Sequence, residues 1–295
     1  MTAARPLLVV AVGGNALSSP AAPEDRALAE ERLTAMTTGA ELALLIARGY
    51  RLLVVHGNGP QVGRLLRHDA DTAQLDIHVA QTQGELGFLL AAALERHSGE
   101  PAVALVTRVE IDADDPHGGD PEKPVGAVLA ERPTGPATRT ADGLGWRRTV
   151  PSPRPRRVLE LASITRLLEH AHVVAGGGGG VPVSADGQSV AGVIDKDRVA
   201  ALLAIDLEAR ALLIGTDVPG AYRDYGKPDQ RLIAAMSVDD SRGLLASGAF
   251  AAGSMGPKVA SAADFVAATG RAAVICQLGD LARALDGGCG TTIGR

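Results

Sequence analysis

Short apolar runs alternate with longer stretches of helical periodicity along most of the chain. The runs Leu7–Val12 and Arg51–Val55 are short and mostly apolar, as buried strands of a parallel sheet are. Between them, Ala and Leu recur at helical spacing from Glu24 to Arg48, and Gly49 supplies a C-terminal stop. This pattern predicts a first strand–helix–strand unit.

The same alternation continues to the C-terminus. It predicts a mainly parallel sheet covered by helices on both faces, and the length of 295 residues fits one large domain or two modest ones. Further strands are expected at 102–106, 172–175, 211–214 and 272–276, and further helices at 83–96, 158–170, 197–207, 257–268 and 281–285.

The segment from Asp112 to Pro155 breaks this alternation. It is rich in Pro, Gly and Asp, has little apolar periodicity, and contains Pro-Ser-Pro-Arg-Pro at 151–155. Long segments of this kind are usually lids, binding loops or linkers. We interpret it as a flap that protrudes from the sheet, and a disordered linker between two domains is the alternative.

The composition is that of a folded, soluble protein, because 46% of the residues are hydrophobic and 21% are charged. Aromatic residues make up only 2%, and the net charge of −5 comes with scattered basic residues, so neither nucleic acid nor a membrane surface is an expected partner. No apolar run has the length of a membrane span, so we expect the cytoplasm. Cys276 and Cys289 lack the spacing of a zinc site and are interpreted as structural.

Lysine is rare in this chain, because only four of the 29 basic side chains are lysine. Such a skew usually reflects genomic base composition, so the lysines that remain are enriched at sites that need a compact ammonium. Chance survival is the alternative explanation for any single one. The four are Lys123, Lys196, Lys227 and Lys258.

Three glycine-rich loops follow predicted strands at equivalent ends. Residues 13–15 follow the first strand, residues 56–61 the second, and residues 176–180 the strand ending at Ala175. Ligands of open parallel sheets bind at these carboxyl ends, where glycine lets backbone N–H groups approach an anion closely. A tight strand-to-helix turn is the alternative for each single loop, but five consecutive glycines favour an anion site.

Neither common nucleotide-binding fingerprint is present, since GxxxxGK[ST] does not occur and residues 57–63 depart from GxGxxG. Lys196 directly precedes the helix predicted at 197–207, and Lys258 is the second residue of the helix predicted at 257–268. At either place an ammonium could reach a phosphoryl group. Asp195 and Asp197 could hold that ammonium, although Asp195 could instead cap its helix. Phosphoryl transfer depends mostly on positioning and charge neutralisation, so this set suits a direct transfer without a nucleophilic side chain.

Seven short phrases spread almost end to end along the chain. They are Val-Gly-Gly-Asn-Ala-Leu at 12–17, His-Gly-Asn-Gly-Pro-Gln-Val-Gly at 56–63, the glycine run with Val-Pro-Val at 176–183, Ile-Asp-Lys-Asp at 194–197, Thr-Asp-Val-Pro-Gly-Ala-Tyr at 216–222, Gly-Lys-Pro-Asp-Gln at 226–230 and Gly-Ser-Met-Gly-Pro-Lys at 253–258. In this order the chain resembles the carbamate kinases of the amino acid kinase family. The second, fourth and sixth phrases look specific to carbamate kinases, whereas the glycine loops and the last phrase occur across the wider family.

The resemblance implies a fold of the α/β class, a three-layer αβα sandwich with a mainly parallel open sheet. A single domain would have an N-terminal lobe at 1–190 for carbamate or carbamoyl phosphate, a flap at about 112–150, and a C-terminal lobe at 191–295 for ATP or ADP. The implied reaction is reversible transfer of the ATP γ-phosphoryl group to carbamate, often run backwards to make ATP. It also implies Mg²⁺ held mainly by nucleotide phosphates, a homodimer, and a place in arginine metabolism.

Roles for single residues follow from the same resemblance. The catalytic set would be Lys196, Lys258, Asp197 and Lys123; the transferring phosphate would contact Gly13, Gly14 and Asn15; the carbamate or carbamoyl group would contact Gly57, Asn58, Gly177, Gly178 and Gly179; and the nucleotide would contact Asp217, Tyr222, Lys227, Pro228, Met255 and Gly256.

The flap departs from the family pattern. The stretch at 120–128 keeps Lys123 and Gly126 but lacks the Pro-Phe that follows in the family, and the segment up to residue 153 is shorter than expected. An altered acceptor preference or a weaker activity could follow. Two other hypotheses therefore stay open: a kinase of the same fold for another small carboxylate such as acetylglutamate, and a nucleotide sensor without catalysis.

Overall fold

A central eight-stranded sheet organises the computed structural model, which describes residues 5–14, 17, 26–68, 74–115, 118–140, 143–250 and 254–295. Its strand order is β14-β16-β15-β11-β1-β2-β9-β3, and every pair is parallel except β15 with β16. The strands are β1 (Leu7–Val12), β2 (Arg51–His56), β3 (Ala102–Ala104), β9 (His172–Val174), β11 (Ala211–Thr216), β14 (Ala235–Ser237), β15 (Ala273–Gln277) and β16 (Thr291–Gly294).

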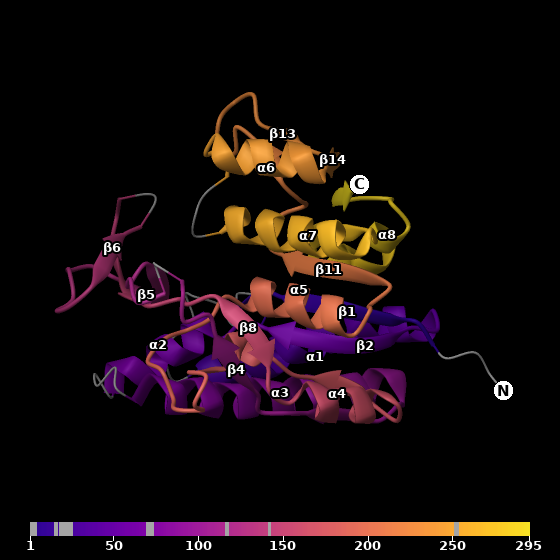
Figure 1. Ribbon diagram of the computed structural model, residues 1–295, viewed down its shortest axis with the longest axis horizontal. Helices are drawn as coiled ribbons and strands as arrows, with labels where there is room; N and C mark the ends of the chain where they lie inside the picture. Colours follow the sequence, from indigo (N-terminus) through magenta and orange to yellow (C-terminus); the bar gives the residue numbers. More distant parts are fainter. Residues whose placement is uncertain are drawn as a thin grey trace.

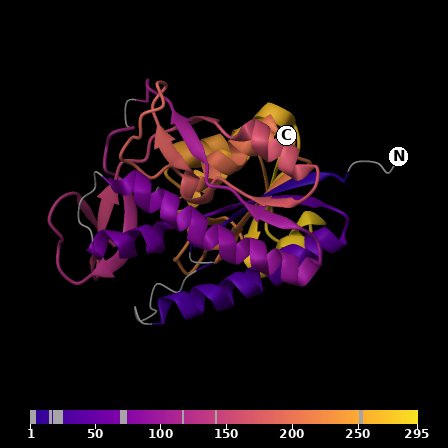
Figure 2. The ribbon, with the colours of Figure 1, turned by 90° about the horizontal axis from the view of Figure 1, so that it is seen from below.

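Alternate side chains of the central strand β1 pack into two separate cores. Leu8 and Val10 pack on one face, with α1 (Ala27–Ala47), α3 (Leu75–Ser98) and α8 (Leu281–Leu285), whereas Val9 and Ala11 pack on the other, with α4 (Leu161–Leu168), α5 (Lys196–Asp206) and α7 (Met255–Thr269). Figure 2 shows the long helices α1 and α3 together on their face of the sheet. The expected three-layer αβα sandwich is therefore confirmed.

The predicted elements of this sandwich differ from the observed ones mainly at their ends. The helix expected at 83–96 is the longer α3, because its first turns carry Leu75 and Val79 into a separate apolar cluster under the flap. The helix expected from residue 158 begins at Leu161, because Val158 instead pairs with Val109 in an antiparallel strand pair. The start predicted at Glu24 lies outside the described residues.

Several short elements were not predicted. They are the helices α2 (Gly59–His68) and α6 (Val238–Ala246), the 3-10 turns Gly177–Gly179 and Leu278–Asp280, a small sheet of β4 (Arg108–Ile111), β8 (Pro155–Val158) and β10 (Val181–Val183), and the hairpin of β12 (Tyr222–Arg223) and β13 (Arg231–Leu232). In α2, Pro60 fits the first turn, where a backbone N–H has no helical partner.

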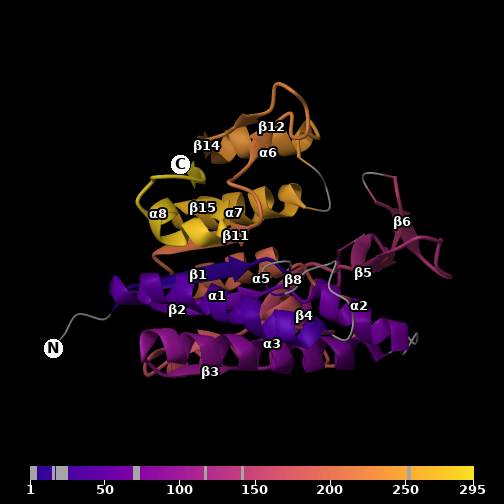
Figure 3. The same cartoon turned by 180° about the vertical axis from the view of Figure 1, so that it is seen from behind.

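The segment that breaks the sequence pattern is a folded flap. Strands β5 (Lys123–Leu129), β7 (Trp146–Val150) and β6 (Ala137–Arg139) form an antiparallel sheet in that order. Figures 1 and 3 show β6 at the end of the flap farthest from the central sheet, while β5 lies near α2. A disordered linker between two domains is therefore the wrong interpretation of this segment.

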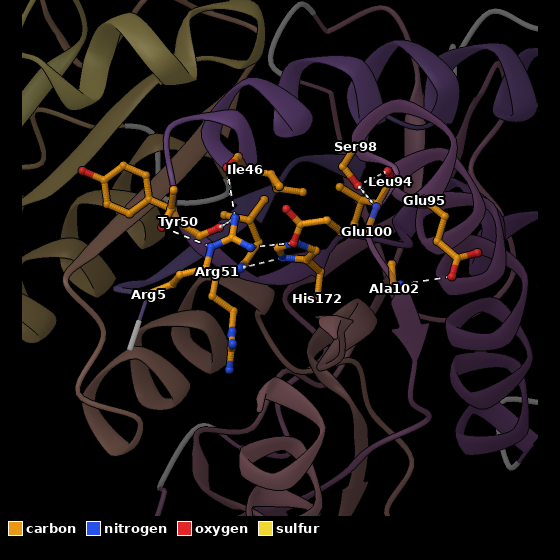
Figure 4. Close-up of polar contacts among 12 residues, drawn as sticks. Arg5, Ile46, Tyr50, Arg51, Leu94, Glu95, Ser98, Glu100, Ala102 and His172 are labelled. Carbon is orange, nitrogen blue, oxygen red and sulfur yellow. Dashed lines mark hydrogen bonds and ion pairs between the residues drawn. The ribbon is translucent and has the colours of Figure 1, made fainter. Parts of the chain in front are cut away.

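The amino ends of the central strands are joined by a polar cluster (Figure 4). Arg5 precedes β1 and donates to Glu100 Oε2 at 2.5 Å and to the carbonyl oxygen of Tyr50 at 3.0 Å. The buried His172, first residue of β9, accepts from the Leu52 N–H through Nδ1 at 3.1 Å and lies 3.2 Å from Glu100 Oε2 through Nε2. Because an N–H only donates, Nε2 carries the ring proton of His172 toward Glu100.

The two cysteines have a structural environment. Cys276 is buried in the core beside α1, and burial raises the pKa of its thiol to about 12, so it stays protonated. Cys289 is half-buried against the same core. In the described parts of the chain, no helix combines the length and the apolar character that a membrane span requires.

Candidate active site

A cavity of about 490 Å³ lies at the carboxyl ends of five central strands. The loops after β1, β2, β9, β11 and β15 meet there, together with the N-termini of α5 and α7 and the first residue of the flap strand β5. Helix N-termini present unpaired backbone N–H groups and a partial positive charge, so this is a favourable place for an anion. The lining comprises residues 13–14, 57–60, 123, 178, 193–197, 216–217, 254, 258 and 277–279.

Two lysines share one aspartate in this cavity. The Nζ of Lys196 donates to Asp197 Oδ1 at 2.6 Å, and the Nζ of Lys258 donates to Asp197 Oδ2 at 2.9 Å. Lys196 and Asp197 open α5, and Lys258 lies in the first turn of α7, so two helices packed side by side bring the three groups together. The sequence-predicted catalytic cluster is therefore assembled, with its side chains 12% exposed or less.

Burial and mutual charge shift the pKa values of this cluster. Burial alone would raise the pKa of Asp197, but the two ammonium groups outweigh it and hold that pKa well below its usual range. Burial lowers the pKa of Lys196 to about 8, helped by the neighbouring Lys258. Burial also acts against the charge on Lys258, yet Asp197 outweighs it and the pKa of Lys258 is raised. The cluster thus keeps its carboxylate ionised and holds one lysine poised to lose its proton.

Lys123 reaches the cavity from the flap. Its Nζ donates to the Ile194 carbonyl oxygen at 2.8 Å and lies 3.6 Å from Asp195 Oδ2. Asp195 also caps α5, because its Oδ1 accepts from the backbone N–H of Asp197 at 2.9 Å. Burial would raise the pKa of Asp195, but Lys123 and then the other lysines outweigh this and lower it. Asp195 therefore caps its helix and also holds an ammonium, but this ammonium belongs to Lys123 of the flap, whereas Lys196 and Lys258 pair with Asp197.

The glycine loops interlock at the floor of the cavity. A Cβ at Gly178, whose φ is +62°, would overlap the Asn58 amide, and a Cβ at Gly57 would lie 2.7 Å from the backbone nitrogen of Gly14. Asn58 donates to Thr82 Oγ1 at 2.9 Å, which fixes its side chain. Close packing therefore accounts for glycine at these positions, and anion binding by the backbone of the loops stays a prediction.

The predicted substrate-binding residues are distributed unevenly. Gly13, Gly14, Gly57, Asn58 and Gly178 line the cavity. Gly177 and Gly179 are buried behind the lining, against His56 and Ile194 respectively, and Asn15 lies outside the described residues.

The predicted nucleotide-binding residues are only partly at the cavity. Asp217 lines it and accepts from Thr216 Oγ1 at 3.0 Å. Met255 and Gly256 form the first turn of α7 between the lining residues Ser254 and Lys258. Outside the lining, Tyr222, Lys227 and Pro228 belong to the β12–β13 hairpin and its connection, where the exposed Lys227 pairs with Asp224 at 2.5 Å. Their contact with a nucleotide stays a prediction.

Sequence reasoning missed two parts of the site. Gln277, Leu278 and Gly279 line the cavity after β15, and the rule that ligands bind at strand carboxyl ends could have identified them. His56 ends β2 under Gly177, where burial lowers its pKa to about 4 with help from Lys196, so its ring is neutral. Nothing in the sequence separates a buried neutral histidine from an exposed one.

Comparison with known proteins agrees with this geometry. The profile of the amino acid kinase family matches residues 6–277. The carbamate kinases of Halobacterium salinarum and Escherichia coli K12 are 38% and 40% identical to this chain, each over 97% of it, and over 97% and 98% of their own lengths.

Solved structures give the same result. The carbamate kinase of Giardia lamblia bound to citric acid superposes with a TM-score of 0.89 at 32% identity, and the form bound to AMP-PNP with 0.86 at 34%, each covering 99% of both chains. The N-acetylglutamate synthase of Neisseria gonorrhoeae, at 20% identity and a TM-score of 0.60, shares the fold. The chain therefore belongs to the amino acid kinase family, and within it to the carbamate kinases.

Proposed function

We propose that this protein catalyses reversible phosphoryl transfer between ATP and carbamate, and that it works mainly to make ATP from carbamoyl phosphate, in arginine metabolism. The observation that carries the proposal is the pair of lysines, Lys196 and Lys258, held by Asp197 within 2.9 Å in a cavity lined by glycine loops. The 38–40% identity to carbamate kinases over almost the whole chain supports the choice of acceptor.

The reaction suits these residues because carbamate is already an anionic nucleophile and needs no general base. In the direction of ATP synthesis, an oxygen of the ADP β-phosphate attacks the phosphorus of carbamoyl phosphate. The bond from phosphorus to the carbamoyl oxygen breaks, and carbamate leaves with the electron pair. Lys196 and Lys258 stabilise the moving phosphoryl group electrostatically, while Asp197 fixes both ammonium groups in advance.

Lys123 supplies a third cation from the flap. We assign it to the carbamoyl phosphate side, because it lines the same cavity and is held by Ile194 and Asp195 next to Lys196. Gly13, Gly14 and Gly57 line that side too, although the N–H groups of Gly13 and Gly57 already donate to the carbonyl oxygens of Gly215 and Val12. Gly178 completes this substrate surface, with Asp217 assigned to the nucleotide side.

The carboxylates of the cavity fit a metal ion that arrives with the nucleotide. Asp195 and Asp197 are engaged by lysine ammonium groups, which leaves Asp217 as an available oxygen ligand. Among the described residues, no three His, Cys, Asp or Glu side chains are grouped to hold a metal. Mg²⁺ bound mainly to nucleotide phosphates, as we propose, would supply charge neutralisation at the phosphates.

ATP formation from carbamoyl phosphate and MgADP tests the proposal directly, since this direction needs no unstable carbamate. We expect rapid ATP synthesis in a luciferase assay, and loss of it when EDTA removes Mg²⁺. Absence of ATP synthesis with ADP still bound, measured by calorimetry, would instead support the nucleotide sensor.

The acceptor is tested in the opposite direction. ATP consumption with carbamate, acetylglutamate and aspartate should show a preference for carbamate of at least about 100-fold in kcat/KM. A preference for acetylglutamate would assign the same phosphoryl site to another acid and would make the altered flap the cause.

We also propose that the protein is a homodimer and that it works in the cytoplasm, where ATP and ADP are available. The dimer proposal is supported by β3, the last strand on its side of the sheet, which is flanked by the exposed Phe88 and Val106 around a hollow of about 410 Å³. Light scattering should give twice the chain mass. Phe88→Asp should give monomers. Leu33→Asp, which changes an exposed apolar residue on α1, should leave the dimer intact.

A further inference from the structure

The base of the flap is seated on helix α2. Val125 of β5 and Val150 of β7 are buried in one apolar cluster with Val62 and Leu66 of α2 and Val79 of α3. This cluster is separate from the two cores that flank the central sheet. The flap therefore has its own attachment to the body, and α2 provides much of it.

Within this attachment, two backbones touch at a pair of glycines. A Cβ at Gly63 of α2 would overlap the Cα and nitrogen of Gly126 in β5, and a Cβ at Gly126 would lie 3.1 Å from the Gly63 Cα. Gly126 also has a φ of +75°, and the pairing of β5 with β7 is irregular between Val125 and Leu129. Only glycine at both positions permits this approach.

A third residue, on the flap, makes a hydrogen bond at the Gly63–Gly126 contact. Arg147 of β7, which is half-buried, donates through Nε to the Gly126 carbonyl oxygen at 3.0 Å. The Gly63–Gly126 contact and this hydrogen bond together form what we call the flap hinge plate, made of Gly63, Gly126 and Arg147. It lies three residues along β5 from Lys123.

Helix α2 is itself held firmly. Its residues Gln61 and Arg64 donate to the buried Glu31 of α1 at 3.0 and 2.8 Å, and Arg64 also donates to Glu85 of α3 at 3.1 Å. The helix begins at Gly59, directly after the loop of Gly57 and Asn58 that lines the cavity. One anchored helix thus carries the substrate loop at its start and the flap one turn later.

We propose that the flap hinge plate sets the position of Lys123 over the substrate cavity, so that Gly63 is a positioning residue for the side that binds carbamoyl phosphate. This inference rests on the proposed function for the identity of the substrate. It accounts for Gly63, the last residue of the 56–63 phrase, which lies outside the cavity lining, and for Gly126, which the altered flap retains.

A double-mutant cycle tests the link between Gly63 and Lys123. Gly63→Ala pushes β5 off α2, and a displacement near 1 Å can cost about 100-fold, so we expect a fall of that order in kcat/KM for carbamoyl phosphate with the KM for ADP within about twofold. In a Lys123→Ala background, the same substitution should change kcat/KM by less than about twofold. Equal losses in both backgrounds, or an equal change in the ADP KM, would overturn the proposal.

A glycine without neighbours provides the matched control. Gly243 lies within α6, and a Cβ there meets nothing within 4 Å, so Gly243→Ala should leave all kinetic constants unchanged. Should Gly63→Ala fail to fold, Arg147→Met removes the hydrogen bond to Gly126 from the flap side and enters the same cycle with Lys123→Ala. Additive losses for Arg147→Met would count against the proposal in the same way.

Trp146 gives a readout that does not depend on catalysis. It is the single tryptophan of the sequence and lies in β7, with the guanidinium carbons of Arg132 and Arg139 5.3 and 5.0 Å from its ring centroid. Time-resolved anisotropy should show Trp146 turning with the whole molecule in the parent and gaining a fast component in Gly63→Ala and Arg147→Met. Unchanged anisotropy in both variants would refute the hinge plate, even if the parent protein were an active carbamate kinase. If both variants gained the fast component but the parent protein made no ATP, only the assigned substrate would be refuted.

Discussion

Two clusters of charged side chains lie at opposite ends of the same parallel sheet, and they differ in burial and in how completely their charges are matched. At the amino ends, Glu100 joins Arg5 to His172, and the remaining donors of Arg5 find backbone carbonyl oxygens. At the carboxyl ends, Lys196 and Lys258 share the single carboxylate of Asp197 beside a cavity.

The difference shows how one scaffold serves two purposes. A cluster whose donors and acceptors are matched inside the protein ties strand ends together and offers nothing to a ligand. The carboxyl-end cluster has three lysines for the two aspartates that pair with them, so one cation is in excess and can interact favourably with an anionic substrate. The predictions below test this contrast.

The largest expected effect is on turnover at the carboxyl-end cluster. Lys258→Ala should lower kcat about 1,000-fold, because it removes one of two cations that stabilise the moving phosphoryl group. Asp197 keeps its partner Lys196, so the thermal midpoint should change little. Arg5→Ala, which removes a cation from the amino-end cluster, should do the opposite and lower stability at unchanged kcat. Near wild-type turnover in Lys258→Ala would contradict the assigned site.

The next effect is a pH dependence that belongs to the same cluster. The pKa of Lys196 is lowered to about 8, so its charged form is lost as pH rises through that value. We expect kcat/KM for carbamoyl phosphate to fall about tenfold per pH unit above pH 8, since this constant reports the free enzyme. Lys196→Arg should be slower but should lack this alkaline limb. A limb that persists in Lys196→Arg would mean that another group titrates.

A moderate effect on stability is expected at the amino-end cluster. His172→Phe leaves the Leu52 N–H without its buried acceptor, which should lower the free energy of unfolding by about 1–3 kcal/mol in urea titrations. Turnover should be unchanged. The neighbouring His170, whose side chain is 84% exposed, serves as the control, because His170→Phe removes no such contact. A loss of turnover in His172→Phe would contradict the separation of the two clusters.

The same variant changes how stability responds to acid. Burial lowers the pKa of both His172 and His56, so the native state binds fewer protons than the unfolded chain, and stability falls as pH drops below about 6.5. For His56 the loss continues to about pH 4. His172→Phe removes one of these two contributions, and its stability should therefore fall less steeply between pH 6.5 and 4.

The smallest expected effect concerns Lys227, which belongs to neither cluster. Its ammonium is exposed and pairs with Asp224 at the protein surface, so Lys227→Ala should leave the thermal midpoint unchanged. If Lys227 contacts the nucleotide, the KM for ADP should rise about threefold while the KM for carbamoyl phosphate stays constant. An unchanged ADP KM would remove Lys227 from the nucleotide site.

Elements whose buried residues leave a local apolar pattern were predictable from the sequence, and elements defined mainly by their tertiary contacts were not. β1 was predicted at its observed bounds, and α8 likewise, because a buried strand or helix leaves an apolar period that needs no partner to be seen. The flap strands β5 and β7 were not predicted, because Pro124 and Gly126 interrupt β5, Arg147 and Arg148 interrupt β7, and their burial depends on contacts with α2 and α3.

The sequence by itself determined the alternation of strands and helices, the carboxyl-end glycine loops and the four lysines, because backbone periodicity and residue chemistry are local properties. It did not determine that Lys196 and Lys258, 62 residues apart, meet on one carboxylate. Nor did it separate Gly178, which faces the cavity, from Gly63, which lets two backbones touch. Those assignments depend on which segments pack together, and only the tertiary structure decided them, because the same residue type serves either purpose according to its neighbours.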